Sequence, residues 1–164
     1  MSGGAKLNVR VAEVVKVNDL ITRFRFVARD GGELPAFSGG AHTVVEMDDH
    51  GTRRLNPYSL MSDPEDTSGY EISVRRDDAG RGGSLFMHGH VKPGMEMVIS
   101  HPVNLFPVDA RAKKHLLLAG GIGITPFLAR LRAGQPDHPA RLIYLYRTEE
   151  DAAYLHELQT FAHS

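Results

Sequence analysis

The chain has 164 residues, of which 41% are hydrophobic and 24% charged, and its formal net charge is −1 at pH 7. This composition is typical of an ordinary folded protein, and the near-zero charge gives no reason to expect nucleic acid or an anionic membrane as a partner. The absence of cysteine excludes disulfides, a cysteine nucleophile and cysteine-ligated zinc or iron–sulfur clusters within these residues. The first residues lack the apolar run of a signal peptide, and no segment approaches the roughly 18 apolar residues of a membrane span. We therefore expect a cytoplasmic protein.

The first two-thirds of the chain are predicted to form β-structure. Residues 21–29 alternate, with Phe24, Phe26 and Ala28 on one face. Turn-forming runs such as RDGGELP and DPEDTSG separate the segments, and no segment of helical period lies among them. The candidate strands, all short and either alternating or rich in β-branched residues, are 7–17, 21–29, 53–62, 70–76 and 95–100. This pattern predicts a small antiparallel barrel or sandwich.

The pattern changes to α/β after residue 112. Residues 115–119 (HLLLA) form a continuous apolar run, as expected of a parallel strand covered on both faces. Thr125 is the predicted N-cap of a helix, and Pro126 fits the first helical position, where its missing N–H costs nothing. Residues 141–147 are predicted to be a second buried strand.

A second helix is predicted to start at the Thr148-x-x-Asp151 capping arrangement, with Tyr154, Leu155 and Leu158 on one face. Two parallel strands with two helices leave both edges of a sheet open. We therefore expect residues 112–164 to be the incomplete first part of a larger α/β domain, following a barrel domain over residues 1–108. The alternative, in which the barrel or a partner chain covers the α/β unit, stays open.

The glycine-rich loop AGGIGITP (119–126) is the first stretch that carries chemistry. It is neither G-x-G-x-x-G, because Pro126 takes the place of the third glycine, nor a Walker loop, because no Gly-Lys-Ser/Thr occurs. Its glycines still let the backbone approach a phosphate, and the following helix offers free N–H groups. The loop therefore indicates nucleotide binding, with a tight strand-to-helix turn as the alternative.

Three weaker stretches precede this loop in a fixed order. RRLNPYSLMS (53–62) places Tyr58 beside Ser59, GRGGSLFMHGHV (80–91) places three glycines before Ser84, and SHPVNLFPV (100–108) joins the two parts. The ordered set resembles the ferredoxin–NADP reductase superfamily, in particular its phthalate dioxygenase reductase branch, whose members supply electrons to bacterial oxygenases. In that family an R-x-Y-S-type flavin motif, a G-x-x-S segment, a P-x-N-x-F-P-L-like linker and a G-G-x-G-x-T-P loop follow one another.

The resemblance implies that residues 1–108 are a flavin-binding barrel domain and that residues 112–164 are the N-terminal, incomplete part of an NAD(P)-binding α/β domain. It also implies roles for individual residues. Tyr58 would pack on a flavin ring, Ser59 would hydrogen-bond its edge near N5, and Thr125 would lie near the nicotinamide, so that Ser59 and Thr125 are the implied catalytic-site residues. The positions implied to bind flavin are Arg54, Asn56, Tyr58, Ser59, Leu60, Gly82, Gly83 and Ser84, the last two at its phosphate. The positions implied to bind the pyridine nucleotide are Gly120, Gly121, Gly123, Thr125, Pro126 and Arg147.

The sequence departs from the family pattern at three points. Asn56 stands where the flavin motif has its arginine, which leaves Arg53, Arg54 and Arg81 as candidate phosphate-binding cations. The family's Cys-Gly-Pro strand is missing, and so is its four-cysteine [2Fe–2S] domain, because the chain has no cysteine. We therefore expect the [2Fe–2S] centre on a missing segment or on a partner.

The resemblance implies a flavin-dependent NAD(P)H oxidoreductase that passes electrons from NADH through FMN to an iron–sulfur centre and an oxygenase. FAD is the second choice of flavin, NADPH remains possible, and a ferredoxin-type acceptor is the other partner; neither nucleic acid nor a membrane is expected. Two alternatives remain open. One is a flavin-binding, non-catalytic module of a larger electron-transfer assembly. The other is a metal-binding β-barrel that uses His88, His90 and His101.

Overall fold

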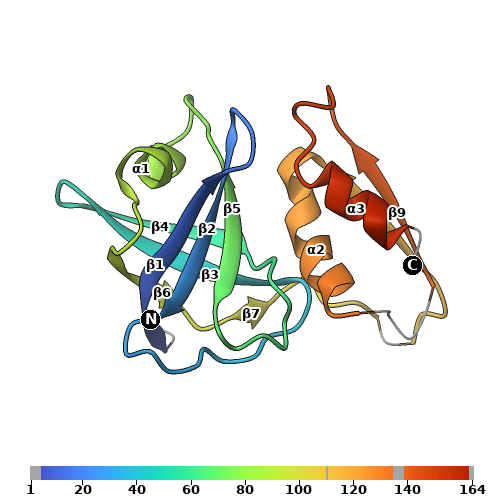
Figure 1. The fold of residues 1–164 in the computed structure, drawn as a ribbon, viewed down its shortest axis with the longest axis horizontal. Helices are drawn as coiled ribbons and strands as arrows, with labels where there is room; N and C mark the ends of the chain where they lie inside the picture. Colours follow the sequence, from blue (N-terminus) through green and yellow to red (C-terminus); the bar gives the residue numbers. More distant parts are fainter. Residues whose placement is uncertain (1–4, 110, 135–138, 163–164) are drawn as a thin grey trace.

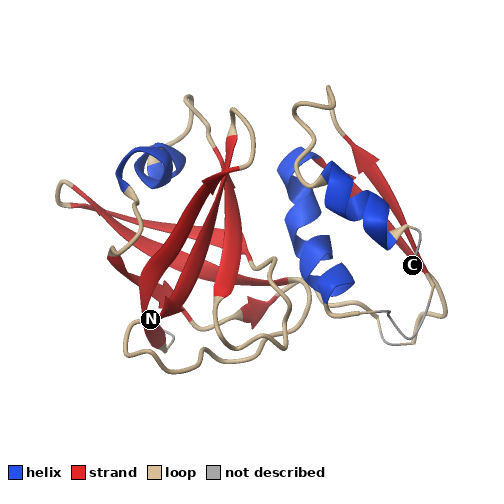
Figure 2. Cartoon of the chain, viewed as in Figure 1, coloured by secondary structure: helices blue, strands red, loops and turns tan. Residues whose placement is uncertain are grey.

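The larger of two sheets contains seven antiparallel strands. The computed structural model describes residues 5–109, 111–134 and 139–162. The strands run in the order β4-β3-β6-β1-β2-β5, with β7 paired to β3, and they curl into a half-barrel (Figures 1 and 2). Their bounds are β1 (Lys6–Lys16), β2 (Ile21–Ala28), β3 (Ala41–Asp49), β4 (Thr52–Ser59), β5 (Tyr70–Arg75), β6 (Glu96–Ser100) and β7 (Val103–Asn104). The antiparallel barrel part of the predicted fold class is confirmed.

The alternating patterns correctly identify the interior of the half-barrel. Phe24 and Phe26 of β2 are fully buried, and they pair across the strands with Ile72 and Tyr70 of β5. Side chains that face each other on the inner side of a sheet pack closely, which fixes the register. Strand β3 had not been predicted; Thr43 occupies one of its buried positions, and the Thr43 hydroxyl donates to the carbonyl of Ser100 at 2.8 Å.

One helix lies where the sequence suggested only loop and strand. Helix α1 (Gly83–His90) follows β5 and covers one end of the half-barrel (Figure 1). Its N-cap, Gly82, has φ 96° and no capping side chain, and only Gly83 and Met87 are buried. The expectation of no helix in this region was wrong, because contacts with the barrel rather than local propensity or capping hold α1 in place.

The second sheet has two parallel strands, β8 (His115–Gly120) and β9 (Ala140–Leu145). Between them lie the 3₁₀ turn η1 (Gly121–Ile124) and α2 (Thr125–Arg132), and α3 (Leu155–Phe161) follows β9. This order confirms the predicted partial α/β unit. Helix α2 lies between the half-barrel and the small sheet (Figure 1). No helix formed by the described residues is long and apolar enough to cross a membrane.

The small sheet is covered on one face only within the described chain. Leu117 and Ala119 are buried, whereas Leu116, Leu118 and Leu145 are 60%, 62% and 64% exposed. The prediction that β8 is covered on both faces is therefore not met by these residues.

Two predicted helix starts were also wrong. Thr125 lies inside α2 with φ −57°, and Ile124 is the N-cap; the Thr125 hydroxyl instead donates to the Ile122 carbonyl at 3.0 Å. The Thr148 hydroxyl does accept the Asp151 N–H at 3.3 Å, but α3 begins only at Leu155. A left-handed residue, Tyr154 with φ 63°, separates that turn from the helix.

Polar contacts join the two sheets. The Arg132 guanidinium of α2 donates to the Met61 carbonyl at 2.8 Å and to the carboxylates of Glu71 at 2.9 Å and Glu157 at 2.7 Å. The hydroxyls of Ser73 in β5 and Tyr154 lie 2.5 Å apart. The outer face of β5, which alternation alone describes as solvated, is therefore the surface on which the α/β unit rests.

Candidate functional site

Residues from two separate sequence stretches line one cavity of about 300 Å³. Asn56 and Tyr58 come from β4, whereas Gly83 and Ser84 begin α1, and the loop after β5 carries the chain between them. Arg81 also lines this cavity. We call it the Tyr58 cavity. The fold thus brings together the two stretches for which the resemblance implied flavin contacts.

Tyr58 is a partly buried wall of this cavity. The Asn56 amide donates to the Tyr58 hydroxyl at 3.3 Å. Burial raises the pKa of Tyr58, and the hydrogen bond from Asn56 opposes that rise in part. The phenol therefore stays neutral at physiological pH and presents a flat, uncharged surface.

The start of α1 is shaped by glycine. Gly82 has φ 96°, and a Cβ at Gly83 would lie 2.3 Å from Nδ2 of Asn56, so neither position accepts a larger residue without a shift. The hydroxyl of Ser84 accepts the Asp77 N–H at 3.0 Å and so ties the loop to the helix. The result is a backbone cradle at a helix N-terminus beside an aromatic wall.

The three candidate phosphate-binding arginines differ in what holds them. Arg53 lies outside the Tyr58 cavity and donates to Glu46 at 2.7 Å; hydrogen bonds from Arg53 and Lys6 lower the pKa of Glu46 to about 2. Arg54 pairs with Asp49 at 2.8 Å and also donates to the Arg81 carbonyl. The Arg81 guanidinium has no ion-pair partner among the described residues. Geometry thus favours Arg81, with Arg54 beside it, over Arg53.

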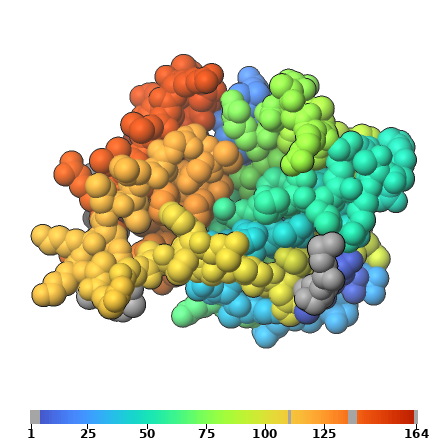
Figure 3. All heavy atoms as spheres, turned by 180° about the vertical axis from the view of Figure 1, so that it is seen from behind, coloured from blue at the N-terminus to red at the C-terminus, as the bar shows by residue number. Residues whose placement is uncertain are grey.

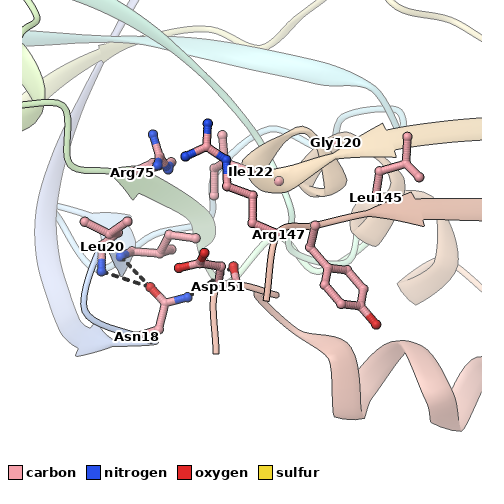
Figure 4. A pocket seen from close by; sticks show the side chains of 11 residues that line it. Asn18, Leu20, Arg75, Gly120, Ile122, Leu145, Arg147 and Asp151 are labelled. Atoms are coloured by element: carbon pink, nitrogen blue, oxygen red, sulfur yellow. Dashed lines mark hydrogen bonds between the residues drawn. The ribbon is translucent and has the colours of Figure 1, made fainter. Parts of the chain in front are cut away.

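A second cavity, of about 480 Å³, contains the glycine-rich loop (Figure 4). Gly120, Gly121 and Ile122 form one wall, and Arg147 enters from the segment after β9. Arg75 at the end of β5 lines this cavity and the Tyr58 cavity alike. We call it the Gly121 cavity. The structure therefore places the loop and Arg147 on one cavity, together with Arg75 from the barrel, and nucleotide binding by these residues stays a prediction.

The glycines of this loop are not required by packing within the chain. A Cβ added at Gly120, Gly121 or Gly123 would meet no atom of the described residues within 4 Å, and of these three glycines only Gly121, with φ 50°, has a left-handed conformation. Glycine at such positions leaves the backbone accessible, which is the condition for close approach to a phosphate.

Ser59 and Pro126 line a third cavity, of about 510 Å³, with His42, Pro57 and Phe106. Phe106 packs edge-on against Phe127 of α2, with ring centroids 5.8 Å apart. Figure 3 shows the segment that contains Phe106, in yellow, crossing the surface between the two parts of the molecule. The end of β4 and the start of α2 thus face each other across this space.

Two residues implied by the resemblance are used elsewhere in the fold. Leu60 is fully buried in the barrel core, and its N–H donates to the Ala41 carbonyl at 2.9 Å. Thr125 is 6% exposed, and its hydroxyl is engaged by Ile122. Neither side chain lines the three cavities described above.

Comparisons with known sequences and with solved structures both point to reductase components of oxygenase systems. No protein-family model matches the chain. The carnitine monooxygenase reductase subunit of Escherichia coli is 45% identical over 159 residues, which cover 96% of this chain and 50% of that protein. Phthalate dioxygenase reductase of Burkholderia cepacia is 38% identical, over 93% of this chain and 47% of that protein. A solved structure of phthalate dioxygenase reductase superposes with a TM-score of 0.85 at 38% identity, over 94% of this chain and 48% of that one.

Over these residues the chain is similar in sequence and in fold to phthalate dioxygenase reductase-like members of the ferredoxin–NADP reductase superfamily. The resemblance read from the four ordered stretches is thereby confirmed. The chain spans about half the length of the curated relatives it matches. The solved phthalate dioxygenase reductase is described as a modular structure for electron transfer from pyridine nucleotides to [2Fe–2S].

The histidines proposed for a metal-binding barrel do not gather in this reductase-like fold. His88 interacts with the Val74 carbonyl at 2.8 Å and with the Thr22 hydroxyl at 3.3 Å, and His90 stacks on Phe86 with ring centroids 5.1 Å apart. Among residues 5–109, 111–134 and 139–162, no group of three or more metal-ligating side chains is found.

Sequence reasoning missed Arg75 and Asn18 at the Gly121 cavity. Arg75 was visible only as one of the polar residues that alternate with Tyr70, Ile72 and Val74, a pattern that usually marks a solvated face. Asn18 accepts the N–H groups of Leu20 and Ile21, and its amide donates to the Glu150 carbonyl at 3.2 Å (Figure 4). No local signal marks either residue, because the α/β unit that they face lies far along the chain.

Proposed function

We propose that this chain carries the flavin-binding and pyridine-nucleotide-binding parts of an oxygenase reductase component. The observation that carries the proposal is the shared wall of two cavities. Arg75 borders both the Tyr58 cavity and the Gly121 cavity, so the two cofactor sites expected from the resemblance adjoin each other. A hydride can pass directly from one bound cofactor to another only where the two sites adjoin.

The Tyr58 cavity fits a flavin mononucleotide. Tyr58 offers a neutral aromatic wall, and the N-terminus of α1 offers N–H groups at Gly83 and Ser84. Arg81 offers a cation that forms no ion pair with any described residue. A bound flavin would supply the chemistry that links the two-electron transfer of a hydride to the transfer of single electrons. The residues of the chain need only hold the ring against Tyr58 and neutralise its phosphate. We favour FMN over FAD because the resembled branch uses FMN.

In this proposal the two parts of the chain bind different cofactors. Residues 1–108 form the flavin domain, and residues 112–164 contribute to the NADH-binding domain. Because the chain has no cysteine, the [2Fe–2S] centre lies outside these 164 residues, and an oxygenase or a ferredoxin-type protein is the final acceptor. Arg147 also leaves room for NADPH.

Flavin titration of the purified chain tests this function. We expect FMN to bind, and Tyr58→Ala to weaken its affinity by about tenfold through loss of ring stacking. Tyr146→Ala, which removes an aromatic ring from the Gly121 cavity, is the matched control and should leave FMN affinity unchanged. A chain that binds neither FMN nor FAD, or equal effects of the two substitutions, would overturn the assignment.

The bare outer face of the β8–β9 sheet supports a second candidate, a flavin-binding module without turnover of its own. Steady-state oxidation of NADH with ferricyanide as acceptor separates the two candidates. A reductase turns over, whereas a module binds flavin and leaves NADH unoxidised. Flavin binding without NADH oxidation would therefore favour the module.

A further inference from the structure

Helix α1 carries part of the Tyr58 cavity, yet few apolar contacts hold it on the half-barrel (Figure 1). Gly83 and Ser84 at its start line that cavity, whereas Met87 is the only large side chain of the helix that is fully buried. A methionine side chain is unbranched and flexible, so its burial fixes the depth of α1 better than its rotation or its shift along the sheet. The orientation of the helix therefore depends on directional contacts.

His88, the residue after Met87, makes such contacts with two strands at once. Nε2 of its ring lies 2.8 Å from the Val74 carbonyl oxygen of β5, and Nδ1 lies 3.3 Å from the Thr22 hydroxyl of β2. Thr22 and Val74 are partners in the antiparallel β2–β5 ladder, so one ring bridges one cross-strand pair. Because a carbonyl can only accept, the hydrogen lies on Nε2, and in the neutral imidazole Nδ1 accepts from the Thr22 hydroxyl. Both ring nitrogens are thereby satisfied.

The contact at His88 also closes the loop that leads from β5 into α1. Val74 lies near the end of β5, and the chain passes from there through Arg81 to the helix. At the start of the helix, the Ser84 hydroxyl accepts the Asp77 N–H of this loop at 3.0 Å. Ser84 and His88 stand at positions i and i+4 of α1, so they lie on the same face of the helix. Together they hold that face toward β5 and its loop.

We propose that His88 is a positioning residue for the flavin phosphate. By bonding to the Val74–Thr22 pair, it holds α1 in the orientation that the proposed function needs, with the N–H groups of Gly83 and Ser84 toward the phosphate. His88 lines none of the three cavities described above, so it acts through the helix. The inference rests on the proposed flavin site and assigns it a residue outside the cavity.

The proposal distinguishes the two halves of a bound FMN. Hydrogen bonds to a phosphate need several donors in the correct place, so the phosphate is sensitive to a shift of α1. The ring would pack on Tyr58, which belongs to β4, and its contact does not depend on the helix. Loss of the His88 contacts should therefore weaken binding of the phosphate and leave binding of the ring unchanged.

Titration of the full chain with FMN and with riboflavin tests this role, since riboflavin has the same ring and lacks the phosphate. His88→Leu keeps a side chain of similar size and removes both hydrogen bonds. We expect it to weaken FMN binding by about tenfold and riboflavin binding by less than about twofold. His88→Gln can still donate to the Val74 carbonyl, so its FMN affinity should stay within about threefold of wild type.

His90→Leu is the matched control. His90 is exposed in the last turn of the same helix, stacks on Phe86 and forms no hydrogen bond with the described residues, so both flavins should bind as they do to wild type. Amide hydrogen exchange in residues 83–90 of the flavin-free chain should be faster in His88→Leu and unchanged in His90→Leu. Thr22→Val removes only the weaker contact and should weaken FMN binding by about two- to threefold.

The outcomes separate this role from the proposed function. Equal losses of FMN and riboflavin affinity in His88→Leu would show a general disturbance of the barrel and overturn the role. If His88→Leu does not fold, unchanged FMN affinity in Thr22→Val would overturn it. A wild-type chain that binds FMN no more tightly than riboflavin would remove the phosphate site from the proposed function, and the role of His88 with it. If wild type prefers FMN and His88→Leu keeps that preference, the flavin site stands and only the role of His88 fails.

Discussion

The half-barrel and the small parallel sheet are built in opposite ways, although each carries one of the proposed cofactor cavities. In the half-barrel the large apolar side chains turn inward, and Phe24 and Phe26 are fully buried. In the small sheet, Leu116 and Leu118 of the central apolar run are more than half exposed. The Tyr58 cavity therefore rests on a complete core, whereas the Gly121 cavity rests on a sheet whose second face is not covered by any of the described residues. Substitutions should reveal this difference first in stability and then in ligand affinity.

The largest expected effect is on the free energy of unfolding, when a buried apolar side chain of the half-barrel is compared with an exposed one of the small sheet. Phe24→Ala removes a fully buried ring and should lower the free energy of unfolding by about 3–5 kcal/mol. Leu118→Ala removes a larger-than-average apolar side chain that is 62% exposed and should change it by less than about 0.5 kcal/mol. Denaturant unfolding measures both. A loss of more than about 2 kcal/mol in Leu118→Ala would show that the bare face is covered in solution.

The next largest effect on stability is expected from substitutions at the contacts between the half-barrel and the α/β unit. Arg132→Met leaves the Met61 carbonyl and two carboxylates without their shared donor, and should cost about 2 kcal/mol in unfolding free energy. Arg111→Met breaks only the exposed pair with Asp109, so it should be nearly neutral. Hydrogen exchange should also become faster in α2 and α3 of the Arg132 variant and stay unchanged in β2. Equal destabilisation by both variants would mean that the Arg132 contacts do not join the two parts.

Two glycines of α1 allow a test of the Tyr58 cavity, because one of them borders this cavity and the other does not. Gly83→Ala should lower stability by about 1 kcal/mol and weaken FMN, because its Cβ meets Asn56 at 2.3 Å. Gly89→Ala, in the same helix with no atom within 4 Å, should raise stability by about 0.5 kcal/mol and leave FMN affinity unchanged. Thermal unfolding and FMN titration measure the two properties. Tighter FMN binding by Gly83→Ala would contradict the cradle.

The strands of the half-barrel could largely be predicted because alternation and burial agree in β2 and β5. Prediction failed where a residue serves a distant contact. Thr43 is a polar residue in a buried position of β3, and α1 is held by the barrel without a capping side chain. Tyr154 leaves the helical conformation where its hydroxyl reaches Ser73. Each case is a long-range interaction that overrides a local preference.

In the candidate site, too, features marked by local sequence patterns were found, and features that depend on distant contacts were missed. The resemblance implied that Tyr58 and Ser84 contact one cofactor and that Gly121 and Arg147 contact another. The structure places each pair on one cavity, and the binding roles of these residues stay predictions. Arg75 was missed because Arg147, which lines the same cavity, lies about seventy residues further along the chain. Tertiary folding brings the two together, and no local sequence pattern predicts it. The roles of Ser59 and Thr125 stay predictions.

In the glycine-rich loop the expected effects on stability are small, and they differ between two of its glycines. Gly121→Ala imposes a left-handed conformation on a residue with a Cβ and should cost about 1 kcal/mol, whereas Gly123→Ala should cost nearly nothing, because it has neither a positive φ nor a neighbour within 4 Å. Both should nevertheless weaken ADP-ribose binding by several-fold, since the resemblance implies that both glycines lie under the pyrophosphate, where a Cβ would hinder the close approach of the backbone. Thermal unfolding and calorimetry on the same samples measure the two quantities. A normal affinity in Gly123→Ala would mean that the loop glycines serve only the strand-to-helix turn. A weakened affinity without a change in stability would separate ligand binding from folding at a position where packing in the chain does not require glycine.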